Sequence, residues 1–171
     1  MSAIVVCPLS RLAETVAAYH ASHIVTLVND GTLFARPPVV EAMNHLHVAV
    51  HDISEPAEGM VLPGEEHVSR YLDFMRRWGR GAPVIVHCFA GISRSTAAAF
   101  SAYCAARPDL DEEAIALRIR QRSPEATPNV RIVALADEIL GRSGRMVRAI
   151  EKIGRGVEAY EGSVFALRLD E

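Results

Sequence analysis

Short apolar runs alternate along this chain with longer amphipathic segments, and the alternation predicts the order of its elements. The short runs are of strand length and end at turn-forming residues. The longer segments repeat apolar residues every three or four positions, which is typical of helices that bury one face. The predicted strands are residues 4–7, 23–28, 45–50 and 83–86. The predicted helices begin at Ser10, Val68, Ser95, Asp111 and Val130.

The end of the chain, residues 141–171, continues this pattern less clearly. A Gly-rich linker at 141–144 precedes a short basic helix with Met146, Val147, Ile150 and Ile153, and residues 163–169 form a candidate edge strand. Strands that alternate with helices indicate an α/β fold with a central, mainly parallel sheet, here of about four to five strands. We expect residues 1–171 to form one domain, in which 141–171 is an extension without an assigned role.

Composition narrows the class of protein. Half of the residues are apolar and 23% are charged, as expected for a globular chain, and the net charge is −3. This charge gives no reason to expect nucleic acid or an anionic membrane as a partner, so any affinity for phosphate must be local. Cys7, Cys88 and Cys104 lack the spacing of a disulfide framework or a zinc site. Without a signal-peptide pattern or an 18-residue apolar run, the sequence predicts a reduced, cytoplasmic protein.

The most informative stretch joins the strand at 83–86 to the helix at 95–106. Cys88 lies at the carboxyl end of that strand, where open α/β sheets bind ligands. Between Cys88 and Arg94 lie five residues whose backbone N–H groups can form a nest for an anion at the start of a helix. Those five residues are Phe89, Ala90, Gly91, Ile92 and Ser93.

The side chains in this loop suit phosphate chemistry. Gly91 allows backbone angles that a side chain would resist. Arg94 can hold two phosphate oxygens with its planar guanidinium and complete the anion site. The same positive surroundings favour the thiolate form of Cys88, which is the nucleophilic form. Ser95 can donate a hydrogen bond to that sulfur when it must leave again.

His87-Cys88, five residues and then Arg94-Ser95 resemble the signature of the cysteine-dependent protein tyrosine phosphatases. The residues Ala90-Gly91 and Ser93-Arg94-Ser95 within it are closest to the dual-specificity branch, of a small bacterial type, and the order of elements resembles that branch over roughly residues 20 to 140. The resemblance implies a phosphatase-like fold and a phosphomonoesterase that works through a phosphocysteine. It implies no metal or cofactor, and a phosphorylated protein or small phosphate ester as substrate. It leaves open the oligomeric state and the choice between phosphotyrosine and phosphoserine or phosphothreonine.

Such a reaction needs an acid for the leaving oxygen, and the resemblance places it on a loop upstream of Cys88. Asp52 follows the predicted strand at 45–50 and is the first candidate; Glu55 in the same loop and Asp30 are the alternatives. The resemblance also implies that His87 orients the nucleophile. Asn129 either braces the phosphate loop or is the N-cap of the helix that follows it.

Three other interpretations remain open. His45, His47 and His51 would share one face of a strand, which invites a metal-site hypothesis. The protein could be a phospho-ligand-binding module without turnover, although Cys88, Arg94 and Ser95 are all present. It could also be a sulfurtransferase of the rhodanese type, which likewise has a Cys loop after a strand.

Overall fold

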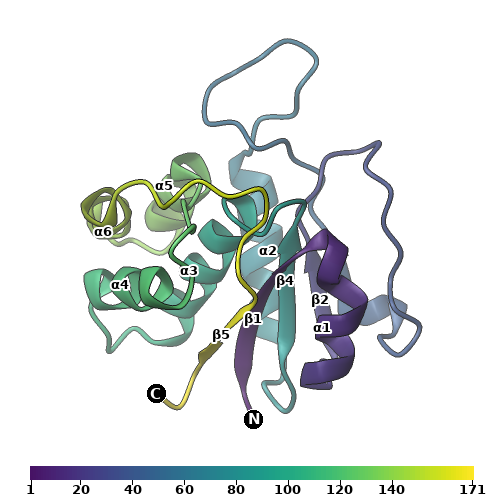
Figure 1. The fold of residues 1–171 in the computed structure, drawn as a ribbon. Helices are drawn as coiled ribbons and strands as arrows, with labels where there is room; N and C mark the ends of the chain where they lie inside the picture. Colours follow the sequence, from purple (N-terminus) through teal and green to yellow (C-terminus); the bar gives the residue numbers. More distant parts are fainter.

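The apolar runs form the five strands of one central sheet in a computed structural model that describes all of residues 1–171 (Figure 1). The sheet order is β3-β2-β4-β1-β5, in which the first four strands are parallel and β5 is antiparallel to β1. This arrangement confirms the predicted mainly parallel sheet. The strands are β1 (Ala3–Pro8), β2 (His23–Thr26), β3 (His45–His47), β4 (Val84–Cys88) and β5 (Phe165–Arg168).

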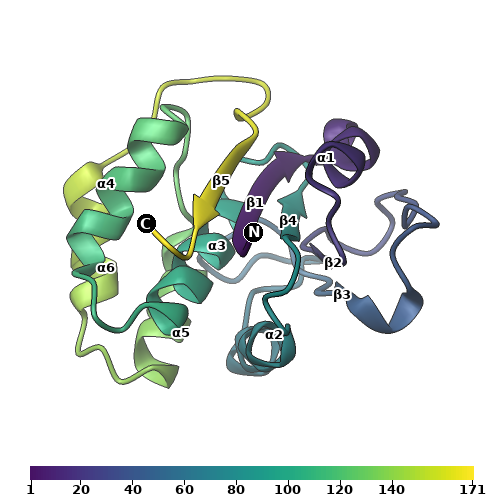
Figure 2. The same cartoon turned by 90° about the horizontal axis from the view of Figure 1, so that it is seen from below.

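Helices cover both faces of the sheet because its central strands are apolar on both sides. In β1, Ile4 and Val6 belong to one hydrophobic cluster, while Val5 and Cys7 belong to the other. Helix α1 covers the second face alone, and α2 and α3 cover the first, with α4, α5 and α6 grouped beside α3 (Figure 2). The helices are α1 (Leu12–Tyr19), α2 (Glu65–Arg77), α3 (Arg94–Ala106), α4 (Glu112–Arg122), α5 (Val130–Ile139) and α6 (Arg145–Ile153). No helix is both long and apolar enough to cross a membrane.

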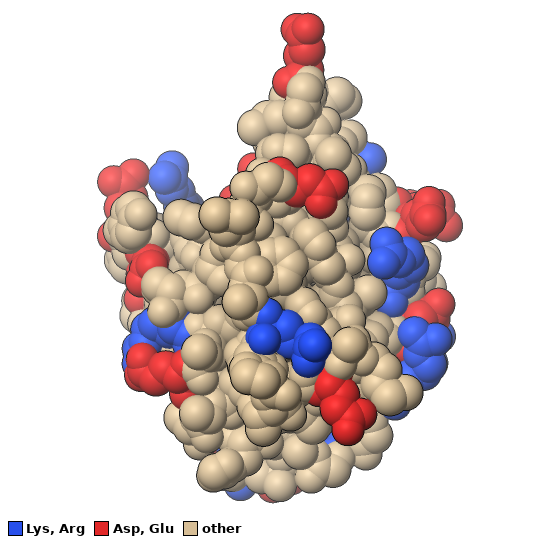
Figure 3. All heavy atoms as spheres, turned by 90° about the vertical axis from the view of Figure 1, so that its right-hand side faces the viewer, with Lys and Arg blue, Asp and Glu red and all other residues tan.

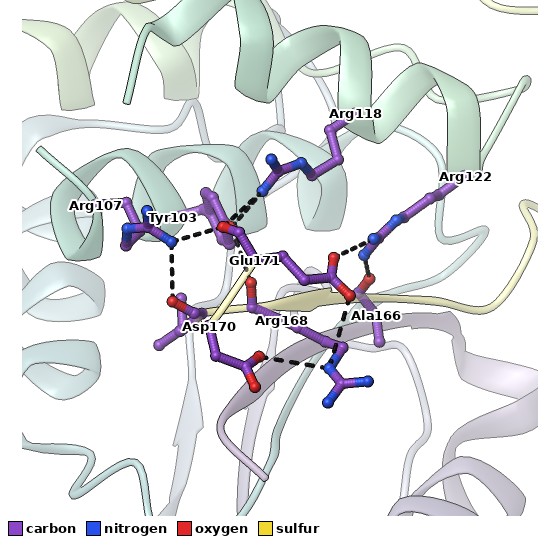
Figure 4. A network of polar contacts seen from close by, with 9 residues as sticks. Tyr103, Arg107, Arg118, Arg122, Ala166, Arg168, Asp170 and Glu171 are labelled. Carbon is purple, nitrogen blue, oxygen red and sulfur yellow. Dashed lines mark hydrogen bonds and ion pairs between the residues drawn. The ribbon is translucent and has the colours of Figure 1, made fainter. Parts of the chain in front are cut away.

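Residues 141–171 are an integral part of the core and the sheet. Met146 of α6 is fully buried, and β5 forms the edge strand beside β1. Arginines of α4 and of the end of α3 hold the strand and the chain end in place (Figure 4). Arg107 donates to the Leu169 carbonyl at 2.9 Å, and Arg122 donates to the carbonyl of Ala166. The segment predicted as an extension therefore completes the fold.

Two local predictions need correction. The third strand ends at His47 rather than at residue 50. Beyond His47, the Val48 N–H still donates a backbone hydrogen bond to the Thr26 carbonyl of the neighbouring strand. Ser10 does not cap α1, because residues 9–11 form a 3₁₀ turn and Arg11 occupies the N-cap position. The cap predicted at Asp111 is confirmed, since its side chain accepts the Glu113 N–H at 2.8 Å.

Candidate active site

The loop between β4 and α3 lies at the carboxyl edge of the sheet, packed against the end of β1. Gly91 has a φ of +71°, and a Cβ atom there would lie 2.8 Å from the backbone nitrogen of Pro8. Both the left-handed conformation and the close approach require glycine at this position. The loop is therefore held tightly against the sheet.

Neighbouring segments hold the carbonyl groups of this loop on its outer side. The backbone N–H of Gly162 donates to the Ala90 carbonyl at 2.8 Å, and the backbone N–H of Asn129 donates to the Ser93 carbonyl at 3.1 Å. The carbonyls of Phe89 and Ile92 accept the N–H groups of Leu9 and Thr127, each at 3.0 Å. With the carbonyls turned outward, the loop can present its N–H groups inward, and the Gly91 N–H does point at Cys88 Sγ, at 3.3 Å. This is the arrangement of an anion-binding nest.

Cys88 and Arg94 lie at the base and at the end of this nest. Cys88 is 2% exposed, and its Sγ lies 3.1 Å from Ser95 Oγ. Arg94 is 8% exposed; its Nη1 donates to the Val50 carbonyl at 2.9 Å, while its buried Nε–H has no partner. An unpaired buried guanidinium N–H is costly, and an oxyanion in the nest would satisfy it.

Asp52 is brought from the neighbouring loop to the same place. Its Oδ1 accepts hydrogen bonds from Ser93 Oγ at 2.7 Å and from Asn129 Nδ2 at 3.0 Å. Asn129 also caps α5, because its Oδ1 accepts the Ile132 N–H at 3.0 Å, so the brace and the cap predicted as alternatives occur together. Glu55 is exposed in the projecting loop, and neither it nor Asp30 makes a side-chain hydrogen bond to the Cys88 loop.

His87, next to Cys88, is fully buried. Its Nε2 shares a 2.7 Å hydrogen bond with Thr26 Oγ1, and its Nδ1 lies 3.2 Å from the Cys88 carbonyl. Burial lowers the pKa of His87 to about 4, so the imidazole is neutral near pH 7. A neutral ring fixed at both nitrogens suits a residue that orients the loop rather than one that carries a proton.

This histidine makes stability depend on pH. The folded pKa of about 4 lies below the ordinary value of 6.5, so the unfolded state binds more protons between these values. The stabilisation is complete above pH 6.5 and is lost as pH falls toward 4, by about 1.4 kcal/mol per pH unit. We expect the pH dependence of the urea midpoint over this range to be shallower in His87→Gln than in the native chain. Parallel curves for the two proteins would contradict this assignment.

The three histidines near β3 do not form a metal site. Only His45 and His47 lie on the strand, where their Nε2 atoms bond to Thr26 Oγ1 and to the Val28 carbonyl, both at 2.8 Å. His51 follows the strand and accepts the Val61 N–H instead. No group of three His, Cys, Asp or Glu side chains in the structure is placed to hold a metal ion. The expectation that the three histidines share a face is wrong because the strand is short.

Sequence reasoning missed several residues that support the loop. Thr26 holds His87, and the backbone of Thr127 and of Gly162 holds the loop carbonyls. A Cβ on Gly162 would lie 2.5 Å from the Gly91 carbonyl oxygen, so glycine permits the close approach. The only signal in the sequence was the presence of glycines in the segment before the last strand, because glycine marks close backbone approach.

Comparisons with known proteins agree with this fold. No family model and no curated protein matches the sequence. Among solved structures, human DUSP28 superposes with a TM-score of 0.62 at 20% identity, over 82% of this chain and 94% of its own. DUSP15 gives 0.61 at 20% identity, over 89% and 92%. Tk-PTP, solved in its active form, gives 0.57 at 22% identity, over 79% and 88%.

These similarities define the class of fold. The chain has the fold of the cysteine-dependent phosphatases, and the solved structures that share this fold include dual-specificity phosphatases. The resemblance inferred from the Cys88 loop is therefore confirmed at the level of the fold.

Proposed function

We propose that this protein is a cysteine-dependent phosphomonoesterase of the protein-tyrosine or dual-specificity type. The observation that carries the proposal is the Cys88 thiol, which lies within hydrogen-bond distance of Ser95 and the Gly91 N–H and is followed by the buried, partly unpaired Arg94. Residues 1–171 would act as one catalytic domain without a metal or cofactor. A phosphorylated protein or a small phosphate ester is the substrate, and the cytoplasm is the proposed compartment.

In this reaction the Cys88 sulfur attacks phosphorus while the bond from phosphorus to the ester oxygen breaks. Asp52 donates a proton to the departing oxygen, so that an alcohol or phenol leaves and a phosphocysteine remains. Water then attacks phosphorus, Asp52 takes its proton, and the thiolate leaves with a hydrogen bond from Ser95. The loop N–H groups from Phe89 to Arg94 and the Arg94 guanidinium stabilise the charge on the three equatorial oxygens in both steps.

The side chains of the Cys88 loop indicate how many phosphoryl groups the substrate carries. Phe89, Ala90 and Ile92 place apolar side chains where a polyphosphate substrate would need cations, and the Phe89 side chain is 49% exposed beside the nest. These residues favour a single phosphoryl group on an organic or peptide carrier. The experiment that tests the reaction class is hydrolysis of p-nitrophenyl phosphate with a chelator present. Turnover supports the proposal, and its absence at every pH from 5 to 8 would contradict it.

Replacement of Asp52 should affect poor leaving groups most. Because Asp52→Ala removes the proton donor, we expect kcat/KM for phenyl phosphate, whose oxygen is a poor leaving group, to fall roughly 10² to 10³-fold. For an activated aryl phosphate, whose oxygen leaves without protonation, we expect a much smaller fall. Steady-state kinetics with the two substrates measures the difference.

Glu55→Ala is the matched control, since Glu55 lies in the same loop and makes no hydrogen bond to the Cys88 loop. It should leave the leaving-group dependence unchanged. If Glu55→Ala instead produces the selective loss and Asp52→Ala does not, Glu55 is the acid.

A further inference from the structure

A cleft of about 900 Å³ opens beside the Cys88 loop, and the segment that precedes β5 forms one of its walls. We call residues 154–162 the C-terminal strap. Figure 1 shows the strap, in yellow, running from α6 across the top of α3 and then turning down into β5. Ile92 and Ser93 of the loop and Asp52 line the cleft on one side, and the strap lines the other. A volume near the top of the range of about 300–1,000 Å³ for ligand pockets leaves space beyond a phosphoryl group.

Contacts at both ends fix the strap against the site. Its last residue, Gly162, donates to the Ala90 carbonyl, and Gly156 donates to Thr127 Oγ1 at 3.0 Å. Arg120 of α4 donates to the carbonyls of Ile153 and Gly154, both at 2.7 Å. The strap then continues into β5, which the arginine network of Figure 4 holds in place. It is therefore a fixed wall of the cleft.

The cleft is acidic, while the Cys88 loop beside it suits an anion. Besides the proposed acid Asp52, three carboxylates line it against one arginine: Glu125, Glu151 and Glu158 against Arg155. Arg155 and Glu158 form an ion pair at 3.2 Å in which both side chains are more than three-quarters exposed, so the pair is weak. Arg94 follows Ser93 in the chain; it does not line the cleft, and its buried Nε–H has no partner. A ligand that reaches from the Cys88 loop into the cleft therefore carries a phosphoryl group and, next to it, positive charge.

The loop opposite the strap extends the same charge. A second hollow shares Asp52, Ser93 and Thr127 with the cleft and adds Glu55. Figure 3 shows acidic side chains at the tip of the tall projection that this loop forms, above a largely uncharged face. Any chain that crosses the Cys88 loop would therefore pass between two acidic rims.

The strap also carries groups that recognise long cationic side chains. Tyr160 is 82% exposed and Val157 is 61% exposed, and both line the cleft. An aromatic ring can stack on a guanidinium or ammonium, and apolar side chains cover the aliphatic stem of Lys or Arg. Carboxylates beside them bind the charged end. This combination favours Arg or Lys over a neutral residue.

We propose that the C-terminal strap determines substrate specificity by binding basic residues that flank the phosphorylated residue of a peptide. This proposal rests on the phosphatase function proposed above. The phosphoryl group enters the Cys88 loop, and an adjacent Arg or Lys lies between Tyr160 and the Glu151 and Glu158 carboxylates.

The test compares phosphotyrosine peptides whose flanking residues are Arg, Gln or Glu. We expect kcat/KM to be roughly tenfold higher for the Arg peptide than for the Glu peptide at low salt, and the ratio to shrink as salt screens the rim charges. Glu151→Gln with Glu158→Gln should reduce this ratio to about two- to threefold, and Arg155→Gln should increase it. Each kcat/KM is divided by the kcat/KM of the same variant for p-nitrophenyl phosphate, because this molecule is too small to reach the strap.

Glu66→Gln with Glu138→Gln is the matched control, because it removes two exposed carboxylates outside the cleft and changes net charge equally. It should leave the ratio unchanged. The proposal is overturned if the native protein shows no preference, or if the control lowers the ratio as much as the cleft variant does. Absence of p-nitrophenyl phosphate turnover would instead contradict the phosphatase function itself. Binding of the same peptides to Cys88→Ser then shows whether the preference for basic residues persists without chemistry.

Discussion

Cys88→Ser should lower phosphatase turnover by roughly 10⁴-fold or more while ligand binding persists. The loop N–H groups and Arg94 that hold the phosphoryl group do not depend on the sulfur, whereas a serine hydroxyl in this place has no base to activate it. The Cys88 sulfur lies 3.1 Å from Ser95 Oγ, and none of the hydrogen bonds to that sulfur comes from a histidine or a carboxylate. Steady-state kinetics and calorimetric titration with a phosphotyrosine peptide measure the two properties.

Cys104→Ala provides the control for this experiment. Cys104 is buried on α3, where burial raises the pKa of its thiol, and it should contribute packing only. We expect Cys104→Ala to keep turnover near the native value. Turnover that survives in Cys88→Ser and is lost in Cys104→Ala would refute the assignment of the nucleophile.

Arg94→Lys should lower kcat/KM roughly 10² to 10³-fold, although the positive charge is kept. The guanidinium can donate to the Val50 carbonyl through Nη1 and still present Nε–H and Nη2 to two phosphate oxygens. A lysine ammonium on a flexible chain cannot make both sets of contacts in one plane. The measurement is kcat/KM for p-nitrophenyl phosphate in the native protein and the variant.

Arg76→Lys is the control, because Arg76 lies on the exposed side of α2 in a surface ion pair with Asp73. It should have no measurable effect on kcat/KM. An Arg94→Lys protein with nearly native kcat/KM would mean that the planar grip on phosphate is not used.

Much of the candidate site could be predicted from the sequence, because most of its residues lie close together along the chain. Cys88, Gly91, Arg94 and Ser95 lie in one strand-loop-helix unit, where an apolar run, a glycine and a buried helix fix the geometry locally. The parallel sheet followed from the same alternation of strands and helices. The predicted positions of Asp52 and Asn129 rested on resemblance, and the structure now shows the two side chains hydrogen-bonded to each other.

What could not be predicted depends on contacts between distant segments. Nothing in the sequence pairs Thr26 with His87 or brings Gly162 to Ala90, because register and strand order decide these contacts. The strand at 45–50 was predicted too long, since Val48 and Val50 are buried like strand residues although the chain has left the sheet. The position of the strap beside the Cys88 loop could not be predicted for the same reason.

The most direct test of the proposed reaction is to trap the phosphocysteine at Cys88. The native protein would be mixed with p-nitrophenyl phosphate, quenched in acid within milliseconds, digested and measured by mass spectrometry. We expect one added phosphoryl group on the peptide that contains Cys88, and none in Cys88→Ser. A phosphoryl group on another residue, or turnover without any covalent adduct on Cys88, would contradict the proposed reaction.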